Sequence, residues 1–361
     1  MNYVAAGLGI FCIISTVMPF IKWGHWSIRM FDFPHVQLTV LTGMTIVCCI
    51  FLLRFKENWT FFLTGSLFIA FLYQIYIIYP YTPLAATRVE ANNTPSEVST
   101  FSILACNVLI DNKSTLALRE LIYEKNPDII ALLEPNQRWV DDLEDLIAQY
   151  PYSVLEPLEN TYGMILLSKL ELQDAAVHHI VREDVPSIFA KAKIPSGQWI
   201  HLYCLHPEPP TPEYGTFSDE RDAELLQVAK HHIDGKQPTV VFGDLNDVAW
   251  SRTTRLFQKM SGLLDPRVGR GTFNTFHADY KILRWPLDHI FHSNHFYLVS
   301  IERLSHIGSD HFPMYIELEY KKEAKIEQDR PVPDTQEKEE AKEIIEQVDL
   351  LEKKQPVDAE Q

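Results

Sequence analysis

Hydrophobic residues in the first part of the chain form three long runs that contain no aspartate, glutamate, lysine or arginine. The runs cover residues 3–21, 36–53 and 59–79. Each is about as long as the ~17–25 residues that a helix needs to cross the hydrocarbon core of a bilayer. Tryptophan and tyrosine residues stand near their ends, as is typical of a membrane–water interface. The pattern therefore predicts a three-helix transmembrane anchor at residues 1–81.

From residue 100 the pattern changes to short β-rich runs that alternate with stretches of helical periodicity. Several of the runs follow one another like hairpins, which favours mixed sheets covered by helices over a simple parallel sheet. Expected strands are residues 100–109, 128–134, 163–168, 187–194, 199–206, 239–246, 287–292, 297–303 and 313–320, and expected helices are residues 114–125, 137–149, 219–233 and 250–260.

Two other segments flank this alternating region. Residues 82–99 are expected to link the anchor to a domain at 100–320. Residues 321–361 are rich in Glu, Lys and Gln, which predicts a charged and largely disordered tail. A weak amphipathic helix is expected within it, around Ile344, Ile345, Val348 and Leu351.

The net charge also differs between these three segments of the chain. The chain carries a net charge of -16, of which residues 82–320 hold -13, while the predicted anchor has a balance of +2 and the tail one of -5. Nonspecific binding to nucleic acid depends on basic groups that release counterions, so this balance disfavours nucleic acid as a partner without excluding it.

The orientation in the membrane is not fixed by the basic residues. With the N-terminus inside, Arg54 and Lys56 lie inside and Lys22, Arg29 and Arg88 outside, and the opposite topology exchanges the two sets. Two basic residues on one side of the membrane and three on the other do not indicate an orientation. We expect a multi-pass protein of the cell membrane, with a slight preference for an extracytoplasmic domain.

Polar side chains follow several apolar runs immediately where the expected strands end. If these strands lie side by side, their ends converge on one rim of the sheets, where a rigid scaffold holds the groups and solvent still enters. Any one of them could be an ordinary turn residue. Six such endings together favour a site: Asn107, Glu134, His206, Asp244 with Asn246, Asp288, and Asp310 with His311.

These residue types suit metal-assisted hydrolysis of a phosphate ester. Hard oxygen donors such as Glu134 and Asp310 suit Mg²⁺ or Mn²⁺. Zinc would be expected to use closely spaced His or Cys, and the sequence has no Cys-x-x-Cys or His-Glu-x-x-His. A carboxylate such as Asp288 or Asp244 beside the imidazole of His311 or His206 provides an oriented acid or base. Acyl chemistry is less well supported, because there is no Gly-x-Ser-x-Gly.

The motifs, taken in order, resemble the endonuclease/exonuclease/phosphatase superfamily, and the leading apolar runs make the chain similar to membrane-attached bacterial members. The resemblance implies a DNase I-like, four-layer α/β/β/α sandwich and a divalent-metal-dependent phosphoesterase. It covers about residues 100–320 and rests on Asn107-Val108, Leu133-Glu134, Leu205-His206-Pro207, Gly243-Asp244-Leu245-Asn246, Leu287-Asp288-His289 and Gly308-Ser309-Asp310-His311.

The resemblance also implies roles for these residues. Glu134 would be the principal metal ligand, with Asp310 nearby and Asn107 close to the metal or its water. Asp244 would orient or activate the attacking water. Asn246 would hold the phosphate, and His206 would contact the phosphate or assist the leaving group. Asp288 would orient His311. Leu109 departs from the pattern, because many DNA-repair members have an acidic residue there, so a repair nuclease is disfavoured.

Other residues carry weaker signals. Gly163 is interpreted as a place where two backbones pack closely, and Tyr162 as a candidate for the wall of the site. Arg267, Arg270 and Arg284 either bind a second phosphate or form salt bridges within their loop.

Two alternatives to a phosphoesterase acting on a lipid-linked ester stay open. One is a nuclease, and the other is a catalytically silent membrane scaffold with the same fold. Retention of so many polar strand ends disfavours the scaffold, because buried polar groups without a role cost stability.

Overall fold

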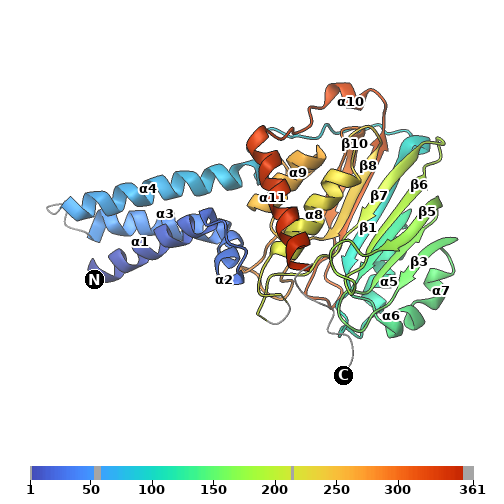
Figure 1. Cartoon of the computed structure of the whole chain (residues 1–361), viewed down its shortest axis with the longest axis horizontal. Coiled ribbons are helices and arrows are strands. Elements are labelled where there is room, and N and C mark those ends of the chain that lie inside the picture. The colour runs from blue at the N-terminus through green and yellow to red at the C-terminus, as the bar shows by residue number, and fades with distance from the viewer. Residues whose placement is uncertain (1, 53–57, 213–214, 353–361) are drawn as a thin grey trace.

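The computed structural model describes residues 2–52, 58–212 and 215–352 and consists of an elongated helical part that projects from a compact α/β domain (Figure 1). Arg54 and Lys56, which enter the topology argument, lie outside the described residues, as do residue 53 of the second apolar run and residues 353–361 of the tail. The N-terminal elements are α1 (Asn2–Val17), η1 (Met18–Phe20), α2 (Trp26–Arg29), η2 (Met30–Asp32), α3 (His35–Leu52), α4 (Asn58–Ile78) and η3 (Tyr79–Tyr81).

Helices α1, α3 and α4 coincide with the three apolar runs and pack on one another. Their shared core contains Cys12, Cys49 and Leu67, and the Gln74 side chain donates a hydrogen bond of 2.6 Å to Thr16. Within the described residues, two helices are long and apolar enough to cross a membrane, α1 with η1 and α4 with η3. A third span results if Trp26–Asp32 and His35–Phe51, bent by 72°, are counted together.

The domain is built from two mixed sheets, which confirms the α/β fold. Strand order in the described residues is β10-β11-β1-β2-β4-β3 in one sheet and β5-β6-β7-β8-β9 in the other. The strands are β1 (Thr100–Asn107), β2 (Ile129–Leu133), β3 (Tyr152–Glu156), β4 (Met164–Ser168), β5 (Glu171–His178), β6 (Ser187–Lys193), β7 (Trp199–Cys204), β8 (Thr239–Asp244), β9 (Asp288–His292), β10 (Phe296–Arg303) and β11 (Met314–Tyr320).

The sheets pack face to face and helices cover their outer faces. Alternate residues of β1, such as Ile103, enter the core between the sheets, while Leu104 points to the opposite face and packs against helices. Helices α5 (Leu116–Lys125), α6 (Gln137–Asp142) and α7 (Glu144–Ile147) cover the first sheet, and α8 (Asp219–His231) and α9 (Arg252–Ser261) cover the second. The order helix, sheet, sheet, helix is the expected four-layer sandwich.

The segments on either side of the sandwich are more ordered than the sequence predicts. Val89, in the expected linker, belongs to the central core, and Ala91 forms a β-bridge with Leu298. After α10 (Ala324–Glu327), the tail forms α11 (Thr335–Glu352), which contains the expected amphipathic helix but is longer, and its Ala341 and Ile345 pack on α8 and α9. The amphipathic stripe is the reason, because a complementary apolar surface exists for it on these helices.

Candidate active site

Strand pairing brings the polar strand ends to one edge of the sandwich. Asn107 lies opposite Leu133 in the parallel β1–β2 pair, so Asn107 and Glu134 leave the first sheet side by side. In the second sheet, Asp244 lies opposite Asp288 in the antiparallel β8–β9 pair. His311 precedes β11, which pairs antiparallel with β1 and therefore begins at the edge where β1 ends.

Several residues at this edge have a backbone in the left-handed region. Leu109, Glu134 and Asn246 have φ angles of 59°, 64° and 51°. Such a conformation costs a non-glycine residue about 1–3 kcal/mol and is held only where the surroundings enforce it. The Asn107 side-chain oxygen accepts from the Leu109 amide, and an Asp244 oxygen from the Asn246 amide, each at 3.0 Å. These bonds fix the turns after β1 and β8 and aim the rest of each side chain at the site.

Two glycines allow the backbones of the site to approach closely. A Cβ at Gly163 would lie 1.9 Å from the Pro135 carbonyl oxygen, and one at Gly243 would lie 2.1 Å from that of Leu205. Gly243 also has a φ of +135°. The glycines therefore permit the turns that carry Glu134 and Asp244, and the expected close packing at Gly163 is confirmed.

Asn107 connects the two sheets. Its amide nitrogen donates to Glu134 Oε1 at 2.7 Å and to Asp244 Oδ2 at 3.3 Å. Ser309 adds a further link, because its hydroxyl donates to the Asn107 carbonyl at 2.8 Å and accepts from the His311 amide at 3.0 Å. Ser309 was not among the predicted site residues, although it stands within the motif that contains two of them.

His311 lies between two carboxylates. Its Nδ1 is 2.7 Å from Asp288 Oδ2 and its Nε2 is 3.4 Å from Asp244 Oδ2. Burial alone would lower the pKa of His311, but the charges of Asp288 and Asp244 outweigh it and raise that pKa to about 10. His311 is therefore an imidazolium at neutral pH, which donates its Nδ1–H to Asp288 and faces Asp244 with its Nε2–H.

His206, unlike His311, is uncharged at neutral pH. Burial lowers its pKa to about 4, so its ring is neutral. Its Nε2 is 4.0 Å from Asp244 Oδ2, its Nδ1 has no hydrogen-bond partner, and its ring packs on that of Tyr162 at 5.5 Å. Asn246 is held from two sides, with its amide nitrogen donating to the Pro207 carbonyl at 3.0 Å and its own carbonyl accepting from Arg221 at 2.7 Å.

All eight predicted site residues meet at one cavity of about 320 Å³. Glu134, His206, Asp244, Asn246, Asp310 and His311 line it, and Asn107 and Asp288 are bonded to lining residues from behind. Tyr162 also lines it, as expected for a residue of the wall. Arg267 does not; it forms a buried ion pair with Asp265 at 2.9 Å, so the salt-bridge alternative holds for this arginine.

The apolar wall of the cavity was not predicted from the sequence. Phe33, Ile110, Phe276 and Leu287 line the cavity beside the polar groups. Phe33 comes from the helical part of the chain and reaches the cavity because Trp250 donates a hydrogen bond of 2.7 Å to the Asp32 carbonyl and Trp285 packs against the Phe33 ring. No local sequence signal places residue 33 beside residue 311; only the tertiary arrangement does.

The family model for the endonuclease/exonuclease/phosphatase family matches residues 104–311, which is more than half of the chain. The matched range includes every residue that lines the cavity except Phe33. The chain belongs to this family. It is accordingly a phosphoric ester hydrolase, and the prediction of an enzyme is confirmed.

Solved structures agree with the fold of an endonuclease/exonuclease/phosphatase family member. The human nocturnin catalytic domain with bound sulfate is 17% identical, with a TM-score of 0.50 over 63% of this chain and 97% of that one. An endonuclease/exonuclease/phosphatase from Bacteroides vulgatus is also 17% identical, with a TM-score of 0.50 over 62% of this chain and 99% of that one. No curated protein matches the sequence. At these identities the likeness supports the fold alone.

Family members typically depend on a divalent metal, and the acidic groups here fit one. Burial raises the pKa of Glu134 to about 7, with smaller effects from its neighbours. Neither Glu134 nor Asp310 forms an ion pair with a lysine or arginine among the described residues, and the His311 imidazolium in the same cavity is paired with Asp288 and Asp244, so these two carboxylates need a further positive charge. A hard cation with oxygen ligands would supply that charge.

A second group of ligand atoms lies deeper. Asp244, Asp288 and His311 have ligand atoms within 4.8 Å of one another. Because His311 donates its Nδ1–H to Asp288 and its Nε2 lies 3.4 Å from Asp244, a metal there would first have to displace a proton of the imidazolium. No ion pair joins Glu134 or Asp310 to this imidazolium in the described parts of the chain.

Proposed function

We propose that the chain is a membrane-anchored phosphoesterase that depends on Mg²⁺ or Mn²⁺ and hydrolyses a lipid-linked phosphate ester at the bilayer surface. The observation that carries the proposal is the single cavity in which Glu134 and Asp310 face the His311 imidazolium and a wall supplied partly by the helical part of the chain. A mixed lining of this kind suits a charged phosphate attached to an apolar group.

Metal ligation is assigned to Glu134 and Asp310, with Asn107 holding Glu134 in place through its 2.7 Å bond. When bound, a divalent cation would polarise the phosphate and neutralise charge that develops on the leaving oxygen. Asn107 has a further function, since its contact with Asp244 keeps the proposed base at a fixed distance from the ligand set.

Asp244 is the proposed base. One of its oxygens is fixed by the Asn246 amide, and the other faces His311 and His206. That second oxygen accepts a proton from water while the water oxygen attacks phosphorus and the ester P–O bond breaks. A base of this kind needs a neighbour that does not compete for the proton, and His206, whose pKa is lowered by burial to about 4, meets that condition.

His311 and Asn246 are proposed to hold the phosphate. The imidazolium is cationic and its Nε2–Asp244 separation of 3.4 Å is long for a hydrogen bond, so the same N–H group can turn to a phosphate oxygen. Asp288 keeps the ring charged and oriented through the opposite nitrogen. His206 adds a neutral hydrogen-bonding group on the other side of the cavity.

Membrane attachment is supported by the surface of the helical part. Phe62, Ile69 and Tyr76 of α4 are 76%, 70% and 71% exposed, and such an apolar surface is unusual on a protein that is surrounded only by water. The three-span, multi-pass topology and the preference for an extracytoplasmic domain belong to this proposal. Protease treatment of sealed cells tests the side, because only a domain outside the membrane is cleaved.

A substrate comparison tests the proposed function directly. The purified full chain in nanodiscs is supplied with Mg²⁺ and either phosphatidylglycerol or a DNA duplex, and product is quantified for the parent protein and for Glu134→Gln. Metal-dependent hydrolysis of the lipid, lost in Glu134→Gln, supports the proposal. Faster cleavage of DNA would favour a nuclease, and absence of any turnover with both substrates would favour the scaffold.

A further inference from the structure

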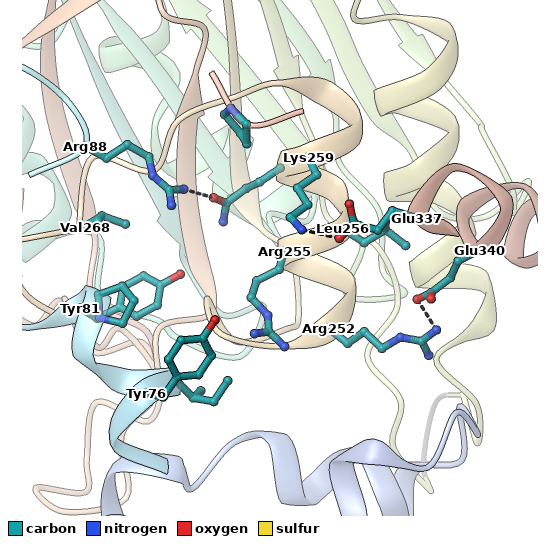
Figure 2. A pocket seen from close by; sticks show the side chains of 14 residues that line it. Tyr76, Tyr81, Arg88, Arg252, Arg255, Leu256, Lys259, Val268, Glu337 and Glu340 are labelled. Atoms are coloured by element: carbon teal, nitrogen blue, oxygen red, sulfur yellow. Dashed lines mark hydrogen bonds and ion pairs between the residues drawn. The ribbon is translucent and has the colours of Figure 1, made fainter. Parts of the chain in front are cut away.

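A second cavity, of about 470 Å³, lies where α4 meets the catalytic domain (Figure 2). Tyr76 and Ile77 from the end of α4 form one wall, α9 forms another, and the N-terminal part of α11 closes a third side. None of the residues assigned to hydrolysis lines it. Its function is therefore separate from the chemistry of the active site.

This cavity is positively charged in an acidic protein. Four basic side chains line it, Arg88, Arg252, Arg255 and Lys259, against two acidic ones, Glu337 and Glu340. The lining has an excess of two positive charges, whereas the chain as a whole has a net charge of -16. Such a local reversal of sign points to an anionic ligand.

Two of the four basic groups are neutralised and two are not. Figure 2 shows Lys259 paired with Glu337 and Arg252 paired with Glu340. Arg88 donates to a neutral group, the Gln258 side-chain oxygen at 3.2 Å.

Arg255 likewise donates to a neutral group, the Ser251 carbonyl at 3.2 Å. Neither Arg88 nor Arg255 forms an ion pair with a carboxylate in the described parts of the chain, and both side chains are exposed. Two guanidinium groups thus remain available, and this group binds phosphate through paired N–H donors.

The position of the cavity specifies the source of the anion. The candidate span Asn58–Tyr81 ends beside it, and Tyr76 and Tyr79 are 71% and 48% exposed there. Exposed aromatic residues next to cations at the end of an apolar helix are typical of the headgroup layer. If α4 crosses a bilayer, Arg88 and Arg255 lie at the depth of the lipid phosphates.

We propose that this cavity binds the phosphate group of an anionic phospholipid, with Arg88 and Arg255 as the phosphate-binding residues. The inference rests on the proposed membrane attachment. Glu337 and Glu340 limit the free charge to that needed for one phosphate group, because they neutralise the other two cations. The C-terminal helix α11 thereby contributes to the selectivity of the site.

The test is a lipid titration of the full chain. Short-chain phosphatidylglycerol or phosphatidylcholine is added in an uncharged detergent, without divalent metal so that no turnover occurs, and bound lipid is counted by native mass spectrometry. Loss of each cation near an anionic headgroup weakens binding about fivefold, so Arg88→Gln/Arg255→Gln is expected to bind phosphatidylglycerol roughly 25-fold more weakly. Phosphatidylcholine binding is expected to stay unchanged.

The matched control is Arg119→Gln/Arg138→Gln, which removes the same charge from α5 and α6. Glu337→Gln/Glu340→Gln is expected to bind phosphatidylglycerol more tightly than the parent. Equal affinity of the parent and Arg88→Gln/Arg255→Gln, or an equal loss in the control, would overturn the site.

Two further arms separate the ligand sources and the two proposals. Displacement of bound phosphatidylglycerol by inorganic phosphate assigns the site to the phosphate group whatever carries it, and no displacement assigns it to the whole lipid headgroup. A chain that does not insert into nanodiscs overturns both membrane attachment and this site. A chain that inserts and hydrolyses lipid, but binds phosphatidylglycerol equally in every variant, overturns this site alone.

Discussion

At the scale of single residues, the chemistry of the cavity depends on polar side chains that are held where strands end. Asn107, Glu134 and Asp244 each follow an apolar run, so the hydrophobic pattern predicts them at one edge of the sheets. The left-handed backbone at Leu109 has no such signal, because leucine is a poor residue for that conformation. Phe33 was missed for a different reason, since its contact with the cavity depends on how the helical part docks.

Asp288 is a positioning residue, and its replacement tests the charge state of His311. Asp288→Asn removes the carboxylate 2.7 Å from Nδ1 while keeping the shape of the side chain. Loss of an oriented partner of this kind lowers turnover by about 10²–10⁴-fold. We expect kcat to fall in that range with little change in KM. Asp145→Asn on the exposed surface is the control, and normal turnover of Asp288→Asn would remove His311 from the mechanism.

Glu224 makes stability depend on pH. Burial raises its pKa from 4.5 to about 7, and the Ser187 hydroxyl lies 2.8 Å away. The folded state therefore favours the protonated form, so the contribution of Glu224 to the free energy of unfolding is greatest below pH 4.5 and is lost as pH rises through 7. The loss amounts to about 3 kcal/mol at most.

Glu224→Gln should remove that contribution to the pH dependence, as measured by denaturant unfolding of the full chain between these pH values. Glu171→Gln, on an exposed strand, should leave the dependence unchanged. An unaltered slope in Glu224→Gln would show that another group is responsible.

At the scale of elements, the strands with buried apolar residues were predicted and two exposed strands were not. The nine expected strands are present within a few residues, because each contains buried apolar or β-branched residues. The two strands that were missed, β3 and β5, lie at sheet edges and are largely exposed. In β5 (Glu171–His178), hydrophobic and polar residues do not alternate regularly. Helix α11 could be predicted as amphipathic but not as docked, since the surface that receives it comes from α8 and α9.

The docking of α11 depends on Ile345, which is 5% exposed and packs with Leu226 and Leu256. Removal of such a buried side chain costs about 2–5 kcal/mol. Ile345→Ala should therefore release the helix, and limited proteolysis between α10 and α11 should become faster. The control variant Leu350→Ala, at a position that is 56% exposed, should be cleaved at the same rate as the parent protein. Equal rates for both variants would mean that α11 is held by its ion pairs and not by its apolar face.

At the scale of the whole molecule, the hydrolase cavity and the apolar helices are joined. Helical residues before α3 contact Trp250 and Trp285, and Phe33 enters the wall of the cavity. A separate soluble enzyme carried on an anchor would not need such a contact. The boundary between the two parts was predictable from hydropathy, whereas their shared cavity was not.

Phe33 is expected to distinguish lipid from soluble substrates. Burying a phenylalanine side chain against an apolar group contributes about 1.5–3 kcal/mol, so Phe33→Ala should lower kcat/KM for a lipid phosphodiester by roughly tenfold or more. A soluble phosphodiester without acyl chains should be affected much less. Phe217→Ala, an exposed aromatic also near the helices, is the control. Equal losses on the two substrates would argue against a lipid.

The central claim is that Glu134 holds the divalent metal needed for hydrolysis. The most direct measurement is turnover of a soluble phosphodiester by the full chain as Mg²⁺ is titrated, for the parent protein, Glu134→Gln and the surface control Glu171→Gln. The account predicts saturable Mg²⁺ dependence in the parent and the control, and a loss of about 10³-fold or more in Glu134→Gln, because a metal contributes several kcal/mol to the transition state. Parental activity of Glu134→Gln, or turnover that does not respond to Mg²⁺, would contradict it.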